Sequence, residues 1–98
     1  MTDNEIFEYH SYKEQCKHIM EEMYELTDAI RDYESCTEAS ELIRNWNHIC
    51  EEVADVEFML NQIKEHYRVK KSNVSSWSKY KRKREIDRIK GGYYENRK

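Results

Sequence analysis

The sequence predicts an all-α protein, an antiparallel bundle of about four helices, and two observations lead to this. The 98 residues contain no proline and only two glycines, Gly91 and Gly92, so residues that break helices are almost absent before the C-terminus. Apolar residues also recur at helical spacing through two long segments. A sheet would need frequent turns, which usually contain the glycine and proline that this chain lacks.

A short first helix is expected at about residues 4–9. Ser11, followed three residues later by Glu14, has the spacing of a capping box, so a second helix is expected to begin there. Its apolar residues recur every three or four positions, at Ile19, Met23, Leu26 and Ile30. The short polar stretch 33–37 is expected to contain the turn.

A third helical region is expected to start near Thr37, a possible N-cap. Its first part, 38–46, could be a separate short helix, with Asn45 or Asn47 capping the next one. From there an apolar series continues to about Tyr67, at Ile49, Val53, Val56, Leu60 and Ile63.

The polar segment 70–76 interrupts the apolar pattern. Ser75 or Ser76 could cap a last helix at 77–90, which Gly91 would end. Residues 1–90 are therefore expected to form one helical domain, followed by a mobile basic tail at 91–98.

The composition predicts that the bundle is completed by oligomerisation. Apolar residues make up 38% of the chain and charged residues another 38%, which is an apolar share below that of typical globular domains. A monomer of this size also buries only a modest fraction of its surface. We expect a homodimer or homotetramer, and the alternative is a thin monomeric bundle.

Charge is distributed unevenly along the chain. Residues 1–67 hold 17 acidic and 5 basic residues, whereas residues 68–98 hold 3 acidic and 12 basic residues. An acidic body followed by a basic end suits a site that holds a cation together with an anionic ligand. The alternatives are a basic end that touches nucleic acid non-specifically, or a solvated helix face.

The cysteines and the hydropathy pattern point to a cytoplasmic protein. Cys16, Cys36 and Cys50 are odd in number and lack CxxC spacing, so neither a disulfide framework nor a zinc site is expected. They are expected to be small core residues. The sequence has no signal-peptide pattern and no apolar run long enough to span a membrane.

Two acidic pairs are the candidate functional residues. Glu22 and Glu25 lie three residues apart in the second helix, and Glu52 and Asp55 do so in the third. This spacing puts both members of a pair on one helix face, where their charges repel unless a cation lies between them. Carboxylate oxygens suit Mg²⁺, with Mn²⁺ as the alternative. Chance is the competing explanation, because the chain has 20 acidic residues.

At these residues the sequence resembles the MazG-like nucleoside triphosphate pyrophosphohydrolases, an all-α family whose pattern is EExxE, a spacer, then ExxD. Here it reads Glu21-Glu22-x-x-Glu25, a spacer of 26 residues, then Glu52-x-x-Asp55. The segments EEMYELTDAI and EEVADVEFMLNQI resemble the two metal-binding helices. The segment KYKRKREIDRI resembles the basic end of short phage and bacterial members.

The resemblance implies a Mg²⁺-dependent hydrolase that cleaves a nucleotide between its α- and β-phosphates. Glu22, Glu25, Glu52 and Asp55 would be the metal ligands, and Glu21 a further catalytic acidic group that binds a second metal or orients the attacking water. In the basic end, the residues that would contact substrate phosphates across the cleft are Lys79, Lys81, Arg84 and Arg88. Family members often carry an asparagine in this region, where Lys83 stands here.

Other functions compete with this one. The alternative is a non-catalytic helical interaction module whose basic C-terminal helix binds nucleic acid, but such a module has no need for four carboxylates, so a nucleic-acid partner is not expected. A di-iron bundle protein would need ExxH motifs, and no histidine has a glutamate three residues before it. Roles near the metal for His18 and His48, and base stacking by Trp46 and Trp77, stay open.

Overall fold

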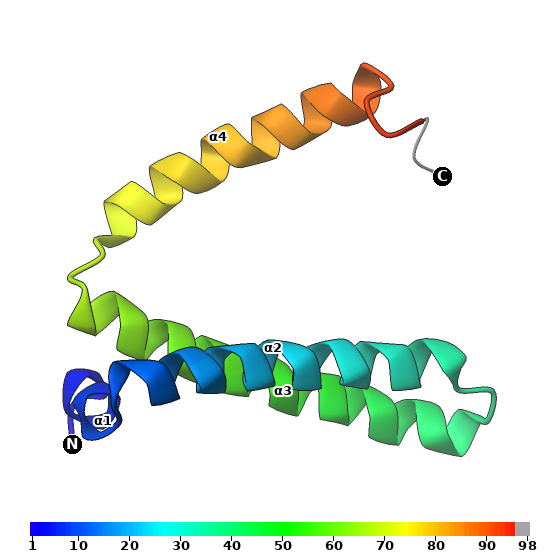
Figure 1. The fold of residues 1–98 in the computed structure, drawn as a ribbon. Coiled ribbons are helices and arrows are strands. Elements are labelled where there is room, and N and C mark those ends of the chain that lie inside the picture. Colours follow the sequence, from blue (N-terminus) through cyan, green and yellow to red (C-terminus); the bar gives the residue numbers. More distant parts are fainter. Residues whose placement is uncertain (96–98) are drawn as a thin grey trace. The chain divides into compact units, whose positions relative to one another are not determined.

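The computed structural model describes residues 1–95 and has four α-helices and no strands in that part of the chain (Figure 1). Helix α1 covers Asp3–Tyr9, α2 covers Tyr12–Ser35, α3 covers Ala39–His66 and α4 covers Lys71–Lys90. The all-α prediction is therefore confirmed. The chain divides into two compact units, Met1–Tyr67 and Arg68–Lys98, and this boundary falls inside the single domain expected for residues 1–90.

The first unit is an antiparallel hairpin of the long helices α2 and α3, with α1 packed on α3 (Figure 1). The predicted capping box starts α2: Ser11 Oγ accepts from the Glu14 N–H, and the Glu14 carboxylate accepts from the Ser11 N–H. At the other end of α2, the Cys36 N–H donates to the Tyr33 carbonyl, and the chain turns into α3.

Helix α3 is continuous over Ala39–His66, so the separate short helix at 38–46 and caps at Asn45 or Asn47 were wrong. Asn45 lies within the helix, and its Nδ2 donates to the Asp32 carbonyl 3.3 Å away, across the hairpin. The N-cap position is held by Glu38, one residue after the predicted Thr37, and it makes no side-chain capping bond.

Helix α1 is fixed to the end of α3 by an aromatic group. The Phe7 ring is buried and stacks on His66, with 4.3 Å between ring centroids, and meets Tyr67 edge-on. The Gln15 side chain, also buried, donates to the Phe7 carbonyl. The sequence did not single out Phe7 or Gln15, because neither belongs to a long periodic series.

Helix α4, in the second unit, begins at Lys71, about two turns before the predicted start at residue 77. The polar segment 70–76 breaks the apolar pattern, but it contains neither proline nor glycine, so nothing in it prevents helix formation. The helix ends at Lys90 with Gly91 as its C-cap, as expected. Of the expected tail, residues 91–94 form turns and Glu95 has a 3-10 conformation, and 96–98 lie outside the described residues.

The interior of the first unit is small. Among the described residues, only Phe7 and Ala29 are buried apolar residues. Several residues of the predicted apolar series are instead 40–47% exposed, namely Met23, Ile30, Val53 and Leu60. Cys16 and Cys36 are half-buried and Cys50 is exposed, so the prediction that all three are core residues was wrong for Cys50. None of the helices in 1–95 has the length and apolar content that a membrane span requires.

Candidate metal centre

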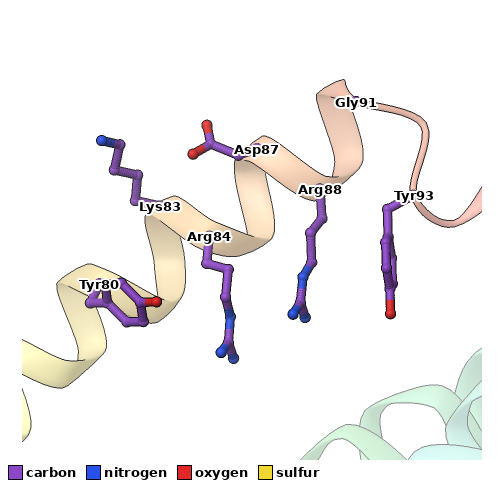
Figure 2. Close-up of a pocket in the computed structure, with 7 residues that line it drawn as sticks. All are labelled: Tyr80, Lys83, Arg84, Asp87, Arg88, Gly91 and Tyr93. Atoms are coloured by element: carbon purple, nitrogen blue, oxygen red, sulfur yellow. The ribbon is translucent and has the colours of Figure 1, made fainter.

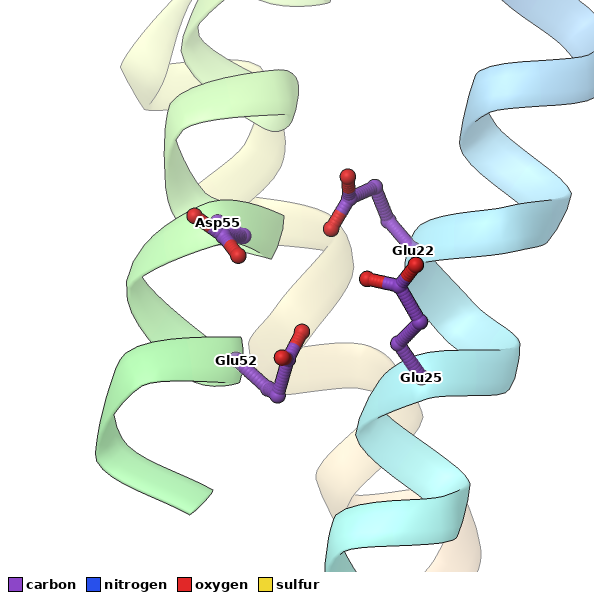
Figure 3. A group of neighbouring side chains, drawn as sticks. All are labelled: Glu22, Glu25, Glu52 and Asp55. Carbon is purple, nitrogen blue, oxygen red and sulfur yellow. The ribbon is translucent and has the colours of Figure 1, made fainter. Parts of the chain in front are cut away.

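The two acidic pairs predicted from the sequence meet in the middle of the hairpin. Glu22 and Glu25 extend from α2, and Glu52 and Asp55 extend from α3 toward them (Figure 3). One carboxylate oxygen from each of the four lies within 4.8 Å of the others. In an octahedral Mg²⁺ site, ligand oxygens about 2.1 Å from the metal are roughly 3.0 to 4.2 Å apart. The four carboxylates are therefore near the spacing that one cation requires.

Helix periodicity and antiparallel packing explain why the pairs meet. Glu22 lies between the buried residues Gln15 and Ala29 at seven-residue steps, so all three are on the α2 face that packs on α3. Ala29, which is completely buried, has only a methyl side chain. Glu52 holds the equivalent place in α3, seven residues after Asn45. Glu25 and Asp55, three residues further along each helix, stand beside this packed face.

The two inner carboxylates are partly unsatisfied. Glu52 is only 6% exposed, and its Oε2 is buried without a hydrogen-bond partner among the described residues. Oε2 of the half-buried Glu22 is also buried and also lacks a hydrogen-bond partner among the described residues. A buried polar atom without a partner costs free energy, about 1–3 kcal/mol for a neutral group and more for a charged one. Both oxygens are therefore oriented for a ligand that accepts their lone pairs.

Burial and mutual repulsion change the protonation of these groups. Removal from water raises the pKa of Glu52 first of all, and the charges of Glu25 and Asp55 raise it further. The pKa of Glu22 is raised for the same reasons, with burial the largest cause and Glu25 the next. The carboxyl groups of Glu22 and Glu52 therefore bind a proton more tightly than an ordinary glutamate does, and a bound metal cation would displace these protons.

His48 partly offsets the negative charge of Glu52. Its Nε2 lies 3.2 Å from Glu52 Oε1, one turn earlier in α3, and this neighbour lowers the pKa of Glu52 against the larger opposing effects. The imidazole holds one oxygen of the carboxylate and leaves Oε2, which lacks a partner, directed elsewhere. His48 therefore positions Glu52. His18 is exposed, and its ring meets the ring of His10 at 4.9 Å.

Glu21 does not join the other four residues. It is exposed on α2, and its carboxylate is 3.9 Å from Lys17 Nζ, one turn earlier. Residues adjacent in a helix point about 100° apart, so Glu21 and Glu22 cannot both face α3. The sequence-based choice of Glu22 as the partner of Glu25 agrees with this arrangement, whereas the further role expected for Glu21 beside the other four is not supported by its position.

A cavity of about 210 Å³ adjoins the acidic cluster through Glu22 and Asp55. Its other lining residues are Gln15, His18, Phe58, Met59 and Gln62. The sequence reasoning passed over Gln15, Phe58 and Gln62, although they lie three to seven residues from the acidic pairs and so on neighbouring helix positions. The cavity is smaller than the 300 to 1,000 Å³ typical of ligand pockets, so it accommodates part of a nucleotide at most.

The predicted phosphate ligands lie on α4, in the second unit. Arg84 and Arg88 line one open cavity, whereas Lys79 and Lys81 do not (Figure 2). Lys83 also lines this cavity. Trp77 is exposed on the same helix, and Trp46 is exposed on α3.

No protein-family model, no curated protein and no solved structure matches the chain.

Proposed function

We propose that this protein is a Mg²⁺-dependent hydrolase that cleaves a nucleoside triphosphate to the monophosphate and pyrophosphate. The observation that carries the proposal is the convergence of Glu22, Glu25, Glu52 and Asp55, with two buried oxygens that have no hydrogen-bond donor among the described residues. A bundle that needed only stability would not place four carboxylates together at its centre. The resemblance of the two motifs to the MazG-like family supports the same function.

The chemistry follows from the residues that would hold the metal. Bound Mg²⁺ or Mn²⁺ supplies charge neutralisation for the triphosphate and lowers the pKa of a coordinated water. Glu52 and Glu22 provide the inner oxygens, and Glu25 and Asp55 the more exposed ones, which leaves the exposed side for phosphate oxygens. His48 keeps Glu52 oriented through the 3.2 Å contact. Glu21 lies apart from the four, so its predicted role in orienting water has no support from the geometry.

Part of the nucleoside would occupy the 210 Å³ cavity beside the carboxylates. Phe58 offers an aromatic ring, and Gln15 and Gln62 offer amide groups. An apolar ring with a few polar groups is the usual composition of a small-molecule site. The proposed roles of Lys79, Lys81, Arg84 and Arg88 as phosphate ligands stay predictions from the sequence.

A second copy of the chain is the proposed partner, because each hairpin helix carries an uncovered apolar row. Along α3 and its C-cap residue Tyr67, an apolar row recurs at seven-residue steps and is at least 40% exposed throughout, at Trp46, Val53, Leu60 and Tyr67. In α2, Met23 and Ile30 form the same kind of row. Seven-residue apolar spacing is the pattern by which helices pack against further helices.

Both rows lie on one side of the hairpin. Met23 follows Glu22 by one residue and Val53 follows Glu52 by one residue, so each row is rotated about 100° in the same sense from the face between the helices. In antiparallel helices, rotations of the same sense point to the same side. Glu25 and Asp55 are rotated the opposite way, so the acidic cluster opens on the other side.

The area of this apolar side suits a dimer. The α3 row spans 21 residues, or about 32 Å, and two adjacent helices are about 20 Å wide. A second copy would therefore cover roughly 600 Å² of each chain, and the total clears the ~1,000 Å² expected of a specific interface. A four-helix dimer with its carboxylates on the outer sides follows from this arrangement.

A nucleotide panel tests the enzymatic proposal. The purified protein is incubated with Mg²⁺ and each common (d)NTP, and pyrophosphate and orthophosphate are measured separately. We expect pyrophosphate from at least one nucleotide and a loss of roughly 100-fold or more for Glu52→Gln. Glu51→Gln, at the exposed neighbouring position, is the matched control and should retain activity. Orthophosphate as the sole product, or equal loss in both variants, would contradict the proposal.

A binding measurement separates metal binding from catalysis. We expect Mg²⁺ or Mn²⁺ to raise the midpoint of thermal unfolding of the wild type and of Glu51→Gln, but not of Glu52→Gln. If the wild type is insensitive to both ions, the four carboxylates do not form a metal site. If metal stabilises the protein but no nucleotide is turned over, the non-catalytic alternative is the better description.

A further inference from the structure

We propose that one face of α4, with the turn that follows it, binds single-stranded nucleic acid through a row of aromatic rings and guanidinium groups. The proposal does not require the enzymatic function, although it assigns another ligand to Arg84 and Arg88, which the sequence suggests as contacts for substrate phosphates. It rests on Trp77, Tyr80, Arg84, Arg88 and Tyr93, which we call the aromatic–arginine ladder. The sequence alone did not favour a nucleic-acid partner, because the four carboxylates of the acidic pairs have no use in such binding; the contacts among these residues are visible only in the structure.

Three contacts join members of the ladder in two groups, one from Trp77 to Arg84 and one between Arg88 and Tyr93. Trp77 and Tyr80 meet edge-to-face, with ring centroids 5.9 Å apart. The Arg84 guanidinium lies 5.8 Å from the Tyr80 ring centroid, and the Arg88 guanidinium lies 5.0 Å from that of Tyr93. Figure 2 shows Arg84, Arg88 and Tyr93 extending in parallel from the same side. Aromatic rings and arginine guanidinium groups along a basic surface are the groups on which unpaired bases stack.

The C-terminal turn of α4 brings Tyr93 into the series. The Tyr93 N–H donates to the Arg88 carbonyl at 2.9 Å, and the Gly92 N–H donates to the Ile89 carbonyl at 3.2 Å. These bonds form a Schellman motif, in which Gly92 has a φ of 74° that suits glycine. The Tyr94 hydroxyl then donates to the Glu85 carboxylate at 2.9 Å. Two consecutive glycines thus fold the chain end back, so that Tyr93 lies against Arg88.

The ladder borders an open cavity of about 480 Å³, which is within the range of ligand sites. Besides Tyr80, Arg84, Arg88 and Tyr93, it is lined by Lys83, Asp87 and Gly91. Figure 2 shows that the carboxylate of Asp87 points away from the side taken by Arg84 and Arg88. Over residues 68–95 the chain has ten basic and three acidic residues, so the surroundings favour a polyanion.

Single-stranded nucleic acid fits this face better than other polyanions do. A membrane-binding helix needs a concentrated apolar face, and the aliphatic residues of α4, Val74, Ile86 and Ile89, do not recur at one helical spacing. In duplex DNA the bases are already stacked and cannot lie on tyrosine rings. The distance from Trp77 to Arg88 is eleven residues, about 16 Å, which is longer than one base needs. Successive unpaired bases on one strand match that length.

Fluorescence anisotropy with a labelled single-stranded dT12 tests the proposal on the full-length protein. We expect Tyr80→Ala to weaken binding by roughly 5- to 100-fold, and Tyr80→Phe to retain most of it, because the ring and not the hydroxyl stacks. Arg88→Ala should weaken binding and lower the slope of log K against log salt by about 0.7. Arg82→Ala is the matched control, since Arg82 lies two residues from Arg84, about 200° around the helix.

Several results would overturn the proposal. Equal effects of Arg82→Ala and Arg88→Ala, with none for Tyr80→Ala, would mean that charge alone attracts the strand. Binding of dTTP as tight as that of dT12 would assign the ladder to a mononucleotide. Equal or tighter binding of a blunt duplex, or of vesicles that contain anionic lipid, would assign it to another polyanion.

One further variant separates this proposal from the enzymatic one. Glu52→Gln should leave the affinity for dT12 unchanged while it abolishes pyrophosphate release, because the two sites lie in different units. If dT12 binding is lost together with activity in Glu52→Gln, the ladder is not an independent site. If dT12 binds as described but no nucleotide is cleaved, only the enzymatic proposal fails.

Discussion

Glu52 is a carboxylate that the protein keeps almost completely out of water, although three other carboxylates lie nearby. One of its oxygens contacts His48, and the other has no partner among the described residues. Such a group opposes folding, and this is why we propose a ligand at the centre of the hairpin. Two consequences can be measured by substituting these buried carboxylates.

Glu52→Gln should raise the free energy of unfolding of the metal-free protein by roughly 1 kcal/mol, because it removes a buried charge and its repulsion by Glu25 and Asp55. Urea denaturation in EDTA measures this. Glu51→Gln, on the exposed side, should change the value by less than about 0.5 kcal/mol. A clear loss of stability in Glu52→Gln would mean that the ionised carboxylate makes favourable contacts in the absence of metal.

The pH dependence of stability follows from the raised pKa values of Glu22 and Glu52. A carboxyl whose pKa is raised on folding binds its proton more tightly in the folded state, so its ionisation opposes folding above its usual pKa of about 4.3. As the pH falls through the raised pKa, that penalty disappears. We therefore expect metal-free wild type to be less stable than the Glu22→Gln/Glu52→Gln double variant at about pH 7.5, and the difference to shrink toward about pH 5.

Urea titrations of both proteins across this range give the difference directly, and other titrating groups cancel because both proteins share them. A gap that stays constant or widens as the pH falls would show that the two carboxyls are not the cause.

At the scale of secondary-structure elements, capping residues that can be recognised in the sequence determine the start of α2 and the end of α4. Ser11 and Glu14 start α2 with reciprocal bonds, and Gly91 and Gly92 end α4 with a Schellman motif. By contrast, Glu38 and Lys70 hold the N-cap positions of α3 and α4 and make no side-chain capping bond. A search for capping residues therefore misplaced the starts of both helices.

Ser11→Ala should lower the free energy of unfolding by about 1 kcal/mol, because the N-cap oxygen that accepts from the Glu14 N–H is lost. Thermal or urea unfolding monitored by circular dichroism measures the change. Ser40→Ala is the control, since Ser40 lies exposed in the first turn of α3, where alanine favours helix. Equal effects of the two substitutions would mean that the capping box does not contribute to stability.

At the scale of the whole molecule, the chain buries few apolar residues for its length. In the first unit, Phe7 and Ala29 are the buried apolar residues among those described, while two apolar rows stay exposed. An isolated pair of helices buries little surface, and a domain of this size is marginal even when its core is complete. The missing interior is the reason to propose a second copy on the side away from the carboxylates.

Val53→Lys should dissociate the proposed dimer, because it places a charge in the middle of the α3 row. Sedimentation equilibrium or light scattering should then give a mass near the 12.1 kDa of one chain, where the wild type gives twice or more that value. Phe58→Lys is the control: Phe58 is similarly exposed on α3 but lies by the acidic cluster, on the other side. A monomeric wild type, or equal dissociation by both variants, would contradict the predicted interface.

Sequence by itself determined the fold class, the capping box and the residues of the acidic cluster, because each depends on spacing within one helix. Glu22 with Glu25, and Glu52 with Asp55, share a helix face whatever surrounds them. Tertiary structure decided what depends on how helices pack. It brought the two pairs within 4.8 Å of one another, left Glu21 outside, and buried Glu52 beside His48. Helical periodicity gives the direction in which a side chain points around the axis of its helix. Only the packing of the neighbouring helix decides which of these directions is buried.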